Sequence, residues 1–231
     1  MGAATRRMTR ALVVAAAGTT PPGPLGQDLG ELFALYAPPP YTAGPLPVEM
    51  PPRPLGMLKP RGEVHRDGDW HRSVHIWLVD AEGRMLLQKR SEHKDTNPGM
   101  LDVSCAGHVT GDDPLLETAM RELEEELGLS IAADELEDAW VCTLPSSHTG
   151  ETKFGKYTCN EYQEIYVVDG WGFDGIESLK LGADEVAGIE LMDAGKVIAA
   201  WEEGDERFVP RGAPYRRVIG CALGYFPGGY F

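Results

Sequence analysis

The feature of the sequence that most restricts its fold is an amphipathic helix predicted between residues 113 and 128. Asp113 and Pro114 supply an N-cap and a first-turn proline, and Gly128 supplies a left-handed stop after the last turn. Between these ends, apolar side chains recur at helical spacing, namely Leu116, Ala119, Met120, Leu123 and Leu127. Because such a helix must bury its apolar face against another element, the chain needs a layered core.

The polar face of the same helix is acidic. Glu122, Glu125 and Glu126 lie at positions i, i+3 and i+4, so their carboxylates share one side. They repel one another unless positive charge lies among them, and Arg121 offers one such charge. A hard divalent cation with oxygen ligands suits the cluster better, while a solvated acidic face is the ordinary alternative in an acidic protein.

Strand-like segments lie on both sides of this helix. Apolar and β-branched runs predict strands at residues 73–80, 84–89, 102–105, 140–143 and 161–168, and a second helix at residues 193–203. The turn at residues 81–83 predicts that the first two strands form a hairpin. Strands and helices in this order predict an α/β fold in which helices cover a mixed β-sheet.

The N-terminal part of the chain has a different composition. Residues 1–58 are predicted to be a Pro-rich extension or linker, followed by one domain at residues 59–231, because residues 1–60 hold 12 of the 18 prolines. Within this part, residues 28–36 are predicted to form a short helix. The first 27 residues contain Arg6, Arg7 and Arg10 and no acid, so organelle targeting is one interpretation and an unstructured tail is the other.

Charge and cysteine usage narrow the partners and the compartment. The chain has 21 Lys and Arg against 36 Asp and Glu, a net charge of −15, which argues against a nucleic-acid binder. Its four cysteines are widely spaced and include no C-x-x-C pair, which favours a reducing, cytoplasmic compartment. No apolar run approaches 18 residues, so no membrane span is expected. The sequence makes no prediction of the oligomeric state.

The acidic helix and the residues before it resemble the Nudix box, whose pattern is G-x5-E-x7-R-E-U-x-E-E-x-G-U, with U an aliphatic residue. Asp113 stands where the family has Glu, which keeps the carboxylate but shortens it by one methylene. The other positions match, namely Gly107, Arg121, Glu122, Leu123, Glu125, Glu126, Gly128 and Leu129. The resemblance implies a Nudix fold, an α/β/α sandwich with a mixed β-sheet, and hydrolysis of a nucleoside diphosphate linked to another moiety.

The resemblance also implies roles for individual residues. Glu125 and Glu126 are implied ligands of Mg²⁺ or Mn²⁺, and Glu122 is both an implied ligand and a candidate general base for water. Arg121 is implied to orient the glutamates and partly neutralise them. Gly107, which has no Cβ, is implied to let a loop backbone approach the metal. Diphosphate hydrolysis needs such parts, because charge on the phosphate oxygens must be neutralised and water must be delivered.

Residues outside the box resemble isopentenyl-diphosphate isomerase and its Nudix relatives. Four positions match residues of the isomerase metal site: His65, His71, His108 and Glu161. The isomerase has its catalytic cysteine immediately before the Gly-His pair, where this chain has Ala106. Cys105 is one place early and would face the opposite way in a strand. This shift and the nearly intact box favour a hydrolase, with an isomerase as one alternative and a non-catalytic binding module as another.

Residues outside the acidic helix are candidates for a further metal ligand and for substrate contacts. Many Nudix hydrolases recruit an additional acid from outside the box, and Glu161 is the candidate here. Substrate contacts are expected from five residues: Lys89, Arg90, His71, His108 and Trp70. Lys89 and Arg90 would meet a distal phosphate or, as the ordinary alternative, form a solvated basic patch, and Trp70 would stack on a base or line a prenyl pocket. The expected partner is a small diphosphate, either a nucleoside diphosphate derivative or a prenyl diphosphate.

Overall fold

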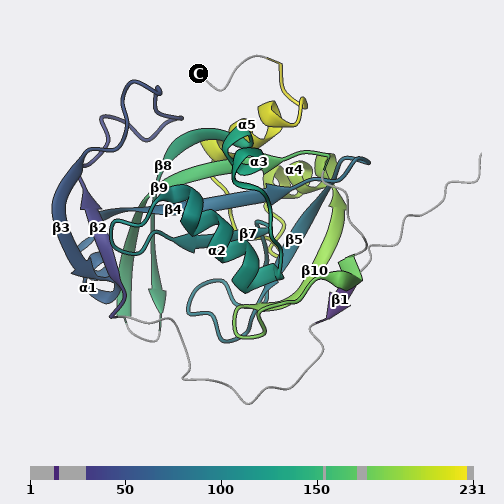
Figure 1. Cartoon of the computed structure of the whole chain (residues 1–231), viewed down its shortest axis with the longest axis horizontal. Helices are drawn as coiled ribbons and strands as arrows, with labels where there is room; N and C mark the ends of the chain where they lie inside the picture. The colour runs from purple at the N-terminus through teal and green to yellow at the C-terminus, as the bar shows by residue number, and fades with distance from the viewer. Residues whose placement is uncertain (1–12, 16–29, 153–154, 171–175, 228–231) are drawn as a thin grey trace, which may run out of the picture.

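Two β-sheets form the centre of the structure, a computed structural model that describes residues 13–15, 30–152, 155–170 and 176–227 (Figure 1). One sheet has the order β1-β10-β5-β6, and the other has the order β3-β2-β4-β9-β8, with β7 paired to β4. The strands are β1 (Val13–Ala15), β2 (Leu32–Tyr36), β3 (Pro54–Pro60), β4 (Trp70–Leu78), β5 (Arg84–Arg90), β6 (Leu101–Asp102), β7 (Cys105–His108), β8 (Trp140–Thr152), β9 (Gly155–Val168) and β10 (Val186–Asp193). The α-helices are α1 (Arg61–Asp67), α2 (Leu115–Leu127), α3 (Ala133–Asp138), α4 (Ala194–Glu203) and α5 (Ala213–Ala222).

Helices cover both sides of the sheets because side chains alternate along the strands. In β4, Val74 and Ile76 are fully buried in one apolar cluster with Leu123 of α2. Trp77 belongs to a second cluster that includes Val197 of α4 and residues of α5. Strand β9 runs parallel to β4 and antiparallel to β8, so the sheet is mixed. The predicted α/β sandwich with a mixed β-sheet is confirmed, and Figure 1 shows α2 lying across the front of the strands.

The predicted hairpin between residues 73–80 and 84–89 is only partly correct. A tight turn forms, in which Gly83 N donates to Asp80 O at 2.9 Å. The two strands then diverge into different sheets, and a single bridge between Val79 and Met85 links them. The reason is that β4 pairs with β9 over its whole length, whereas β5 pairs with β10.

The predicted helix at residues 28–36 is wrong where the structure describes it. Residues 32–36 form strand β2, which pairs with β3, and residues 28–29 lie outside the described residues. A segment this short, followed by three prolines, gains little as an isolated helix. As a strand, it buries Phe33 and Leu35 in a cluster with Val64 of α1. Strand β2 and most of β3 precede residue 59, at which we predicted the domain to begin.

Other predicted elements are present with shifted bounds. Helix α2 begins at Leu115, and its N-cap is Pro114 rather than Asp113. The predicted strand at 102–105 is divided between β6 and β7, which belong to different sheets. The sequence analysis does not predict α1, α3 or α5; of these, α1 and α3 have only 7 and 6 residues and so carry few periodic positions.

The structure leaves the predicted targeting segment untested. Arg6, Arg7 and Arg10 lie outside the described residues. Among the residues that are described, no helix has both the length and the apolar character needed to cross a bilayer.

Candidate functional site

A cleft of about 1340 Å³ is lined by residues of α2, β4, β7, β9 and the first turn of α5. The wall from α2 consists of Arg121, Glu122 and Glu125. The sheet presents mainly polar side chains to the cleft, including Ser73 and His75 of β4. Two groups of titratable side chains meet this cleft, one rich in glutamates and one rich in histidines.

The glutamate cluster is anchored by a close contact between α2 and β7. A Cβ atom on Gly107 would lie only 2.0 Å from Cδ of Glu122, so only glycine lets the Glu122 carboxylate occupy its observed place. Arg121 Nη1 lies 2.9 Å from Glu122 Oε1 and 3.0 Å from Glu125 Oε2. The predicted loop at Gly107 is corrected here, because Gly107 belongs to strand β7.

Glu126 is the most buried member of the glutamate cluster. Its Oε2 accepts hydrogen bonds from Gln88 Nε2 at 2.8 Å and from Ala106 N at 3.2 Å. It also shares a hydrogen bond with Glu185, a carboxylate that the sequence did not single out. Glu185 precedes β10 and forms an ion pair with Lys94. The cluster therefore contains four carboxylates, which we define as Glu122, Glu125, Glu126 and Glu185.

The electrostatics of this glutamate cluster suit the binding of a cation. Burial raises the pKa of Glu122 to about 7 and the pKa of Glu126 to about 8, because an uncompensated buried charge is costly. Burial also favours a raised pKa for Glu185. The charge of Lys94 and its hydrogen bond to Glu185 act in the opposite direction, and the pKa of Glu185 is held below its ordinary value. Arg121 Nη2 is buried without a hydrogen-bond partner among the described residues. A donor set made only of carboxylate oxygens fits Mg²⁺ or Mn²⁺.

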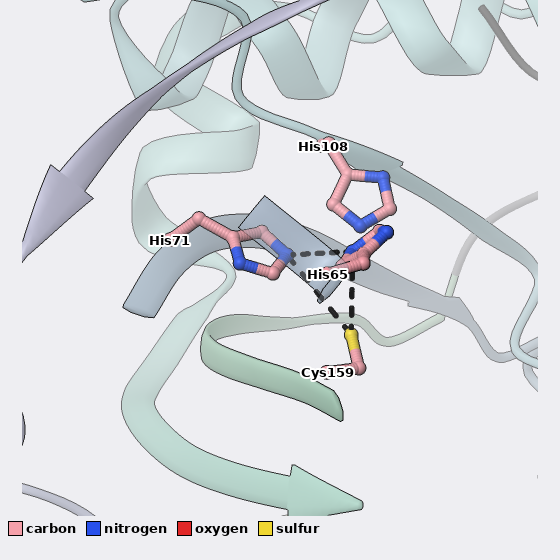
Figure 2. A group of neighbouring side chains, drawn as sticks. All are labelled: His65, His71, His108 and Cys159. Atoms are coloured by element: carbon pink, nitrogen blue, oxygen red, sulfur yellow. Dashed lines mark hydrogen bonds between the residues drawn. The ribbon is translucent and has the colours of Figure 1, made fainter. Parts of the chain in front are cut away.

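A second cluster consists of His65 from α1, His71 from β4, His108 from β7 and Cys159 from β9 (Figure 2). His65 Nε2 lies 3.4 Å from His71 Nε2 and 3.7 Å from Cys159 Sγ. Cys159 Sγ lies 4.0 Å from His71 Nε2. We call these four residues the histidine–cysteine cluster. Figure 2 shows that their donor atoms converge from four separate elements.

Strand register brings this second cluster together. In the parallel pair of β4 and β9, His71 lies opposite Glu161, two residues after Cys159 and on the same face. In the antiparallel pair of β4 and β7, Ser73 lies opposite His108. Phe33 of β2 covers the group, with its ring stacked at 5.1 Å on His71 and at 4.8 Å on His108.

Glu161 belongs with the histidines rather than with the other glutamates. Its Oε1 lies 3.1 Å from His108 Nε2 and 3.2 Å from Cys159 Sγ. Burial by itself raises the pKa of Glu161, but the hydrogen bond from His108 and the neighbouring imidazoles hold it well below its ordinary value. Burial lowers the pKa of His65 to about 4 and also lowers the pKa values of His71 and His108.

The structure separates the predicted substrate contacts. Arg90 and His108 line the cleft. His71 is fully buried, and Trp70 packs at 5.0 Å between ring centroids against Tyr162 in a small core cluster. Lys89 is exposed on β5. Among the described residues, the cleft wall includes neither Trp70 nor Lys89.

Sequence reasoning missed a buried ionic group opposite α2. Asp102 pairs with Arg90 at 3.0 Å and also with Arg211, and both arginines line the cleft. Tyr215 of α5 lies 3.1 Å from His75 Nδ1 and stacks beneath Arg211. No local signal predicted this group, because residues 211–215 meet β4 and β6 only through the packing of α5.

The two residues before Gly107 face opposite ways. Cys105 is fully buried in the apolar cluster with Leu123, as expected for a small apolar residue. Ala106 lines the cleft. The position at which the isomerase has its catalytic cysteine therefore carries only a methyl group here.

Comparison with known proteins gives a consistent family match. A family model described as the NUDIX domain matches residues 69–212. Nudix hydrolase 3 of Arabidopsis thaliana is 39% identical over 156 residues, which cover 67% of this chain and 20% of that protein. An uncharacterized Nudix hydrolase of Clostridium acetobutylicum is 38% identical over 138 residues, which cover 58% of this chain and 63% of that protein. The chain thus spans about a fifth of the plant relative and under two thirds of the clostridial one.

Solved structures are more distant. DR0079 from Deinococcus radiodurans aligns with a TM-score of 0.48 and 19% identity, covering 83% of this chain and 99% of that chain. A bifunctional NMN adenylyltransferase/ADP ribose pyrophosphatase from Francisella tularensis aligns with a TM-score of 0.46 and 15% identity, covering 66% of this chain and 41% of that chain.

Proposed function

The chain belongs to the NUDIX domain family, and from this premise we propose that it is a hydrolase that uses Mg²⁺ or Mn²⁺ to cleave a diphosphate linkage in a small molecule. One observation carries the proposal: three carboxylates, those of Glu122, Glu125 and Glu185, line the cleft, and Glu126 is buried beside Glu185; the pKa values of Glu122 and Glu126 are strongly raised. A bound cation would relieve that unfavourable burial and meet the phosphates of a substrate in the cleft.

The glutamate cluster would hold the cation through Glu122, Glu125 and Glu126, with Glu185 beside them. A divalent ion there supplies charge neutralisation on the phosphate oxygens and an acidified water. Other residues of the chain position the glutamates. Arg121 orients Glu122 and Glu125, and Gln88 with the Ala106 amide fixes Glu126.

Glu122 is the proposed general base for water. It lines the cleft, and its carboxylate is held in place between Arg121 and the backbone of Gly107. A carboxylate in that position is able to accept a proton from water as the diphosphate bond breaks. Glu125 is the most exposed of the three helix glutamates and is proposed as a ligand only.

The opposite wall is proposed to bind the rest of the substrate. Arg90 and Arg211 share the single carboxylate of Asp102, which leaves one surplus positive charge beside the cleft for a phosphate. Ser73 Oγ and Gln163 Oε1 are buried there without hydrogen-bond partners among the described residues. A lining with such free polar atoms favours a nucleoside diphosphate derivative over a prenyl diphosphate.

An isomerase acting on isopentenyl diphosphate is the second candidate, because His65, His71, His108 and Glu161 lie together as the resemblance implies. We propose the hydrolase instead. Isomerisation needs an aimed acid-base pair, and Cys105 is buried in the core while Ala106 faces the cleft. A non-catalytic module is disfavoured, because burying Glu122 and Glu126 close to other carboxylates lowers stability when no cation is bound.

The test is a panel of nucleoside and prenyl diphosphates, incubated with and without Mg²⁺ and followed by product chromatography. We expect cation-dependent hydrolysis of at least one nucleoside diphosphate derivative. Glu125→Gln is the matched control. It keeps the shape of the side chain and removes the charge, so it should lose most of this hydrolysis. Clean formation of dimethylallyl diphosphate, without hydrolysis of any compound, would contradict the proposal.

The cellular setting is also a proposal. The four cysteines are widely spaced in the sequence and include no C-x-x-C pair, which supports a reducing compartment such as the cytoplasm. The net charge of −15 supports a small-molecule partner rather than a nucleic acid.

A further inference from the structure

We propose that His65, His71, His108 and Cys159 form a second metal site, which takes a transition ion of the Zn²⁺ type and not Mg²⁺. One donor atom from each residue lies within 4.8 Å of the others. The inference does not depend on the proposed hydrolysis, since it concerns a separate set of ligands with different chemistry.

The spacing of the donor atoms fits an ion at their centre. In a tetrahedral zinc site, Zn–N distances of about 2.0–2.1 Å and a Zn–S distance of about 2.3 Å place two nitrogens about 3.3 Å apart and nitrogen and sulfur about 3.6 Å apart. The corresponding distances here are 3.4 Å between His65 and His71, and 3.7 Å and 4.0 Å from Cys159 to these two histidines. The donor atom of His108 lies within 4.8 Å of the other three, so small side-chain rotations would complete such a site.

Cys159 decides which metal is selected. Histidine nitrogen and cysteine sulfur are both donors that Zn²⁺ takes, whereas Mg²⁺ prefers oxygen ligands. The resemblance to the isomerase implied three histidines and Glu161. The structure adds a sulfur donor, which makes the site softer than the glutamate cluster.

The local charge also fits a divalent ion. Glu161 is buried, and its ion-pair partners among the described residues are His71 and His108. A thiolate at Cys159 together with the Glu161 carboxylate would balance the two charges of the ion. Phe33, which is fully buried, stacks on His71 and His108 and shields them from water on that side, whereas His65, His108 and Cys159 also border the cleft. A neutral site avoids the cost of leaving charge unpaired in the interior.

The proposed role of this ion is structural. Its ligands come from α1, β4, β7 and β9, so one ion would tie together four elements that are distant in sequence. Four protein ligands leave no open position, which is typical of structural zinc sites. His108 is next to Gly107, which carries the close contact with Glu122. The ion would therefore also fix the strand on which the glutamate cluster depends.

The experiment loads the full chain, first freed of metal with a chelator, with Zn²⁺ or with Co²⁺ alone and then desalts it. We expect about one zinc per chain by elemental analysis, as four protein ligands predict. The cobalt form should show a thiolate-to-cobalt charge-transfer band. Cys159→Ser should weaken zinc retention tenfold or more and abolish that band, whereas Cys105→Ser, at another buried cysteine, should keep both.

Further variants separate the outcomes. Glu125→Gln should leave zinc content unchanged, because that residue belongs to the glutamate cluster. His65→Ala, at a half-buried ligand, should also weaken zinc retention and so gives a second test if Cys159→Ser does not fold. Substoichiometric zinc in the wild-type chain, or a cobalt band that survives Cys159→Ser, overturns the inference. Hydrolysis without zinc binding would refute only this inference, and zinc binding without hydrolysis would refute only the proposed function.

Discussion

The glutamate cluster and the histidine–cysteine cluster lie on the two faces of the same short strand. In β7, Gly107 meets the Glu122 carboxylate, and its neighbour His108 belongs to the other cluster. Three of the four members of the first cluster come from one helix, whereas the second takes one residue from each of four elements. The glutamates offer oxygen donors suited to a hard ion, and the second cluster offers nitrogen and sulfur donors suited to a softer ion.

This difference teaches how two kinds of site arise in one fold. A helix places residues at i, i+3 and i+4 on one side whatever surrounds it, so a cluster built in this way is local. A site built from strands needs correct register in several pairs at once. A one-residue slip of β9 against β4 would turn Cys159 and Glu161 to the opposite face.

The largest expected effect separates the chemistry of the two clusters. Glu125→Gln and Glu126→Gln should each lower hydrolysis on the order of 10²-fold or more, because each removes a charged ligand and keeps the shape of the side chain. Steady-state assays at saturating Mg²⁺ measure the loss, and zinc content should not change. Near-native rates in both variants would show that the catalytic cation lies elsewhere.

Gly107→Ala tests the strand that the two clusters share. The added methyl group would displace the Glu122 carboxylate, which is a flexible end, so the fold should survive while hydrolysis falls on the order of 10²-fold. Gly44→Ala is the control, since Gly44, like Gly107, does not lie at positive φ, and a Cβ atom there would meet nothing within 4 Å. Thermal unfolding and turnover should be measured together. Equal losses of turnover in the two variants would argue against the contact with Glu122.

Phe33→Ala should affect the histidine–cysteine cluster more than the glutamates. Loss of a fully buried ring that stacks on two histidines is expected to cost about 3–5 kcal/mol of unfolding free energy. Urea denaturation measures the change. Leu32→Ala, at an exposed neighbour on the same strand, should cost much less.

Removal of residues 1–50 tests the predicted boundary between the extension and the domain. It deletes β2 and with it Phe33. If the domain truly begins at residue 59, the truncated chain should unfold cooperatively at nearly the full-length temperature. The contacts of Phe33 favour a clear loss of stability instead.

The folding stability of the metal-free protein should depend on pH with opposite signs at the two clusters. The folded pKa values of Glu122 and Glu126 are raised to about 7 and about 8. Their contribution to stability is therefore fully present below about pH 4.5 and is lost as the pH rises through these values. The folded pKa of His65 is lowered to about 4, so its contribution is present above about pH 6.5 and is lost as pH falls.

Two variants test which residues cause the loss of stability at high pH (the alkaline arm of the profile) and at low pH (the acid arm). Each proton difference contributes a slope of about 1.4 kcal/mol per pH unit. Glu126→Gln should flatten the alkaline arm, and His65→Ala should flatten the acid arm, as followed by urea denaturation between pH 4 and pH 9. Saturating Mg²⁺ should also flatten the alkaline arm. Identical profiles in the wild type and both variants would contradict the assignment.

The smallest expected effect on turnover is that of Cys105→Ser. Hydrolysis should stay within a few-fold of wild type, because Cys105 lies in the apolar core and outside the cleft wall formed by the described residues. The same variant should lower stability, since it buries a hydroxyl. If it abolished an isomerisation of isopentenyl diphosphate, the hydrolase proposal would have to be withdrawn.

The local parts of the molecule could be predicted from the sequence. Helix α2, its acidic face and its stop at Gly128 follow from spacing along a single element, and the predicted helix is displaced by one residue at its start. The burial of Cys105 and Trp77 follows from their residue types and their alternation in strands. In such cases the physics acts between residues that are neighbours in the chain, so sequence spacing carries the information.

Only the tertiary structure decided how distant segments meet. It made residues 32–36 a strand rather than a helix, and it separated the predicted hairpin into two sheets. It also brought Glu185 to Glu126 and Cys159 to three histidines, contacts for which no spacing rule exists. Such contacts depend on strand register and on the packing of whole elements. These are fixed by the summed burial of many side chains and not by any local pattern.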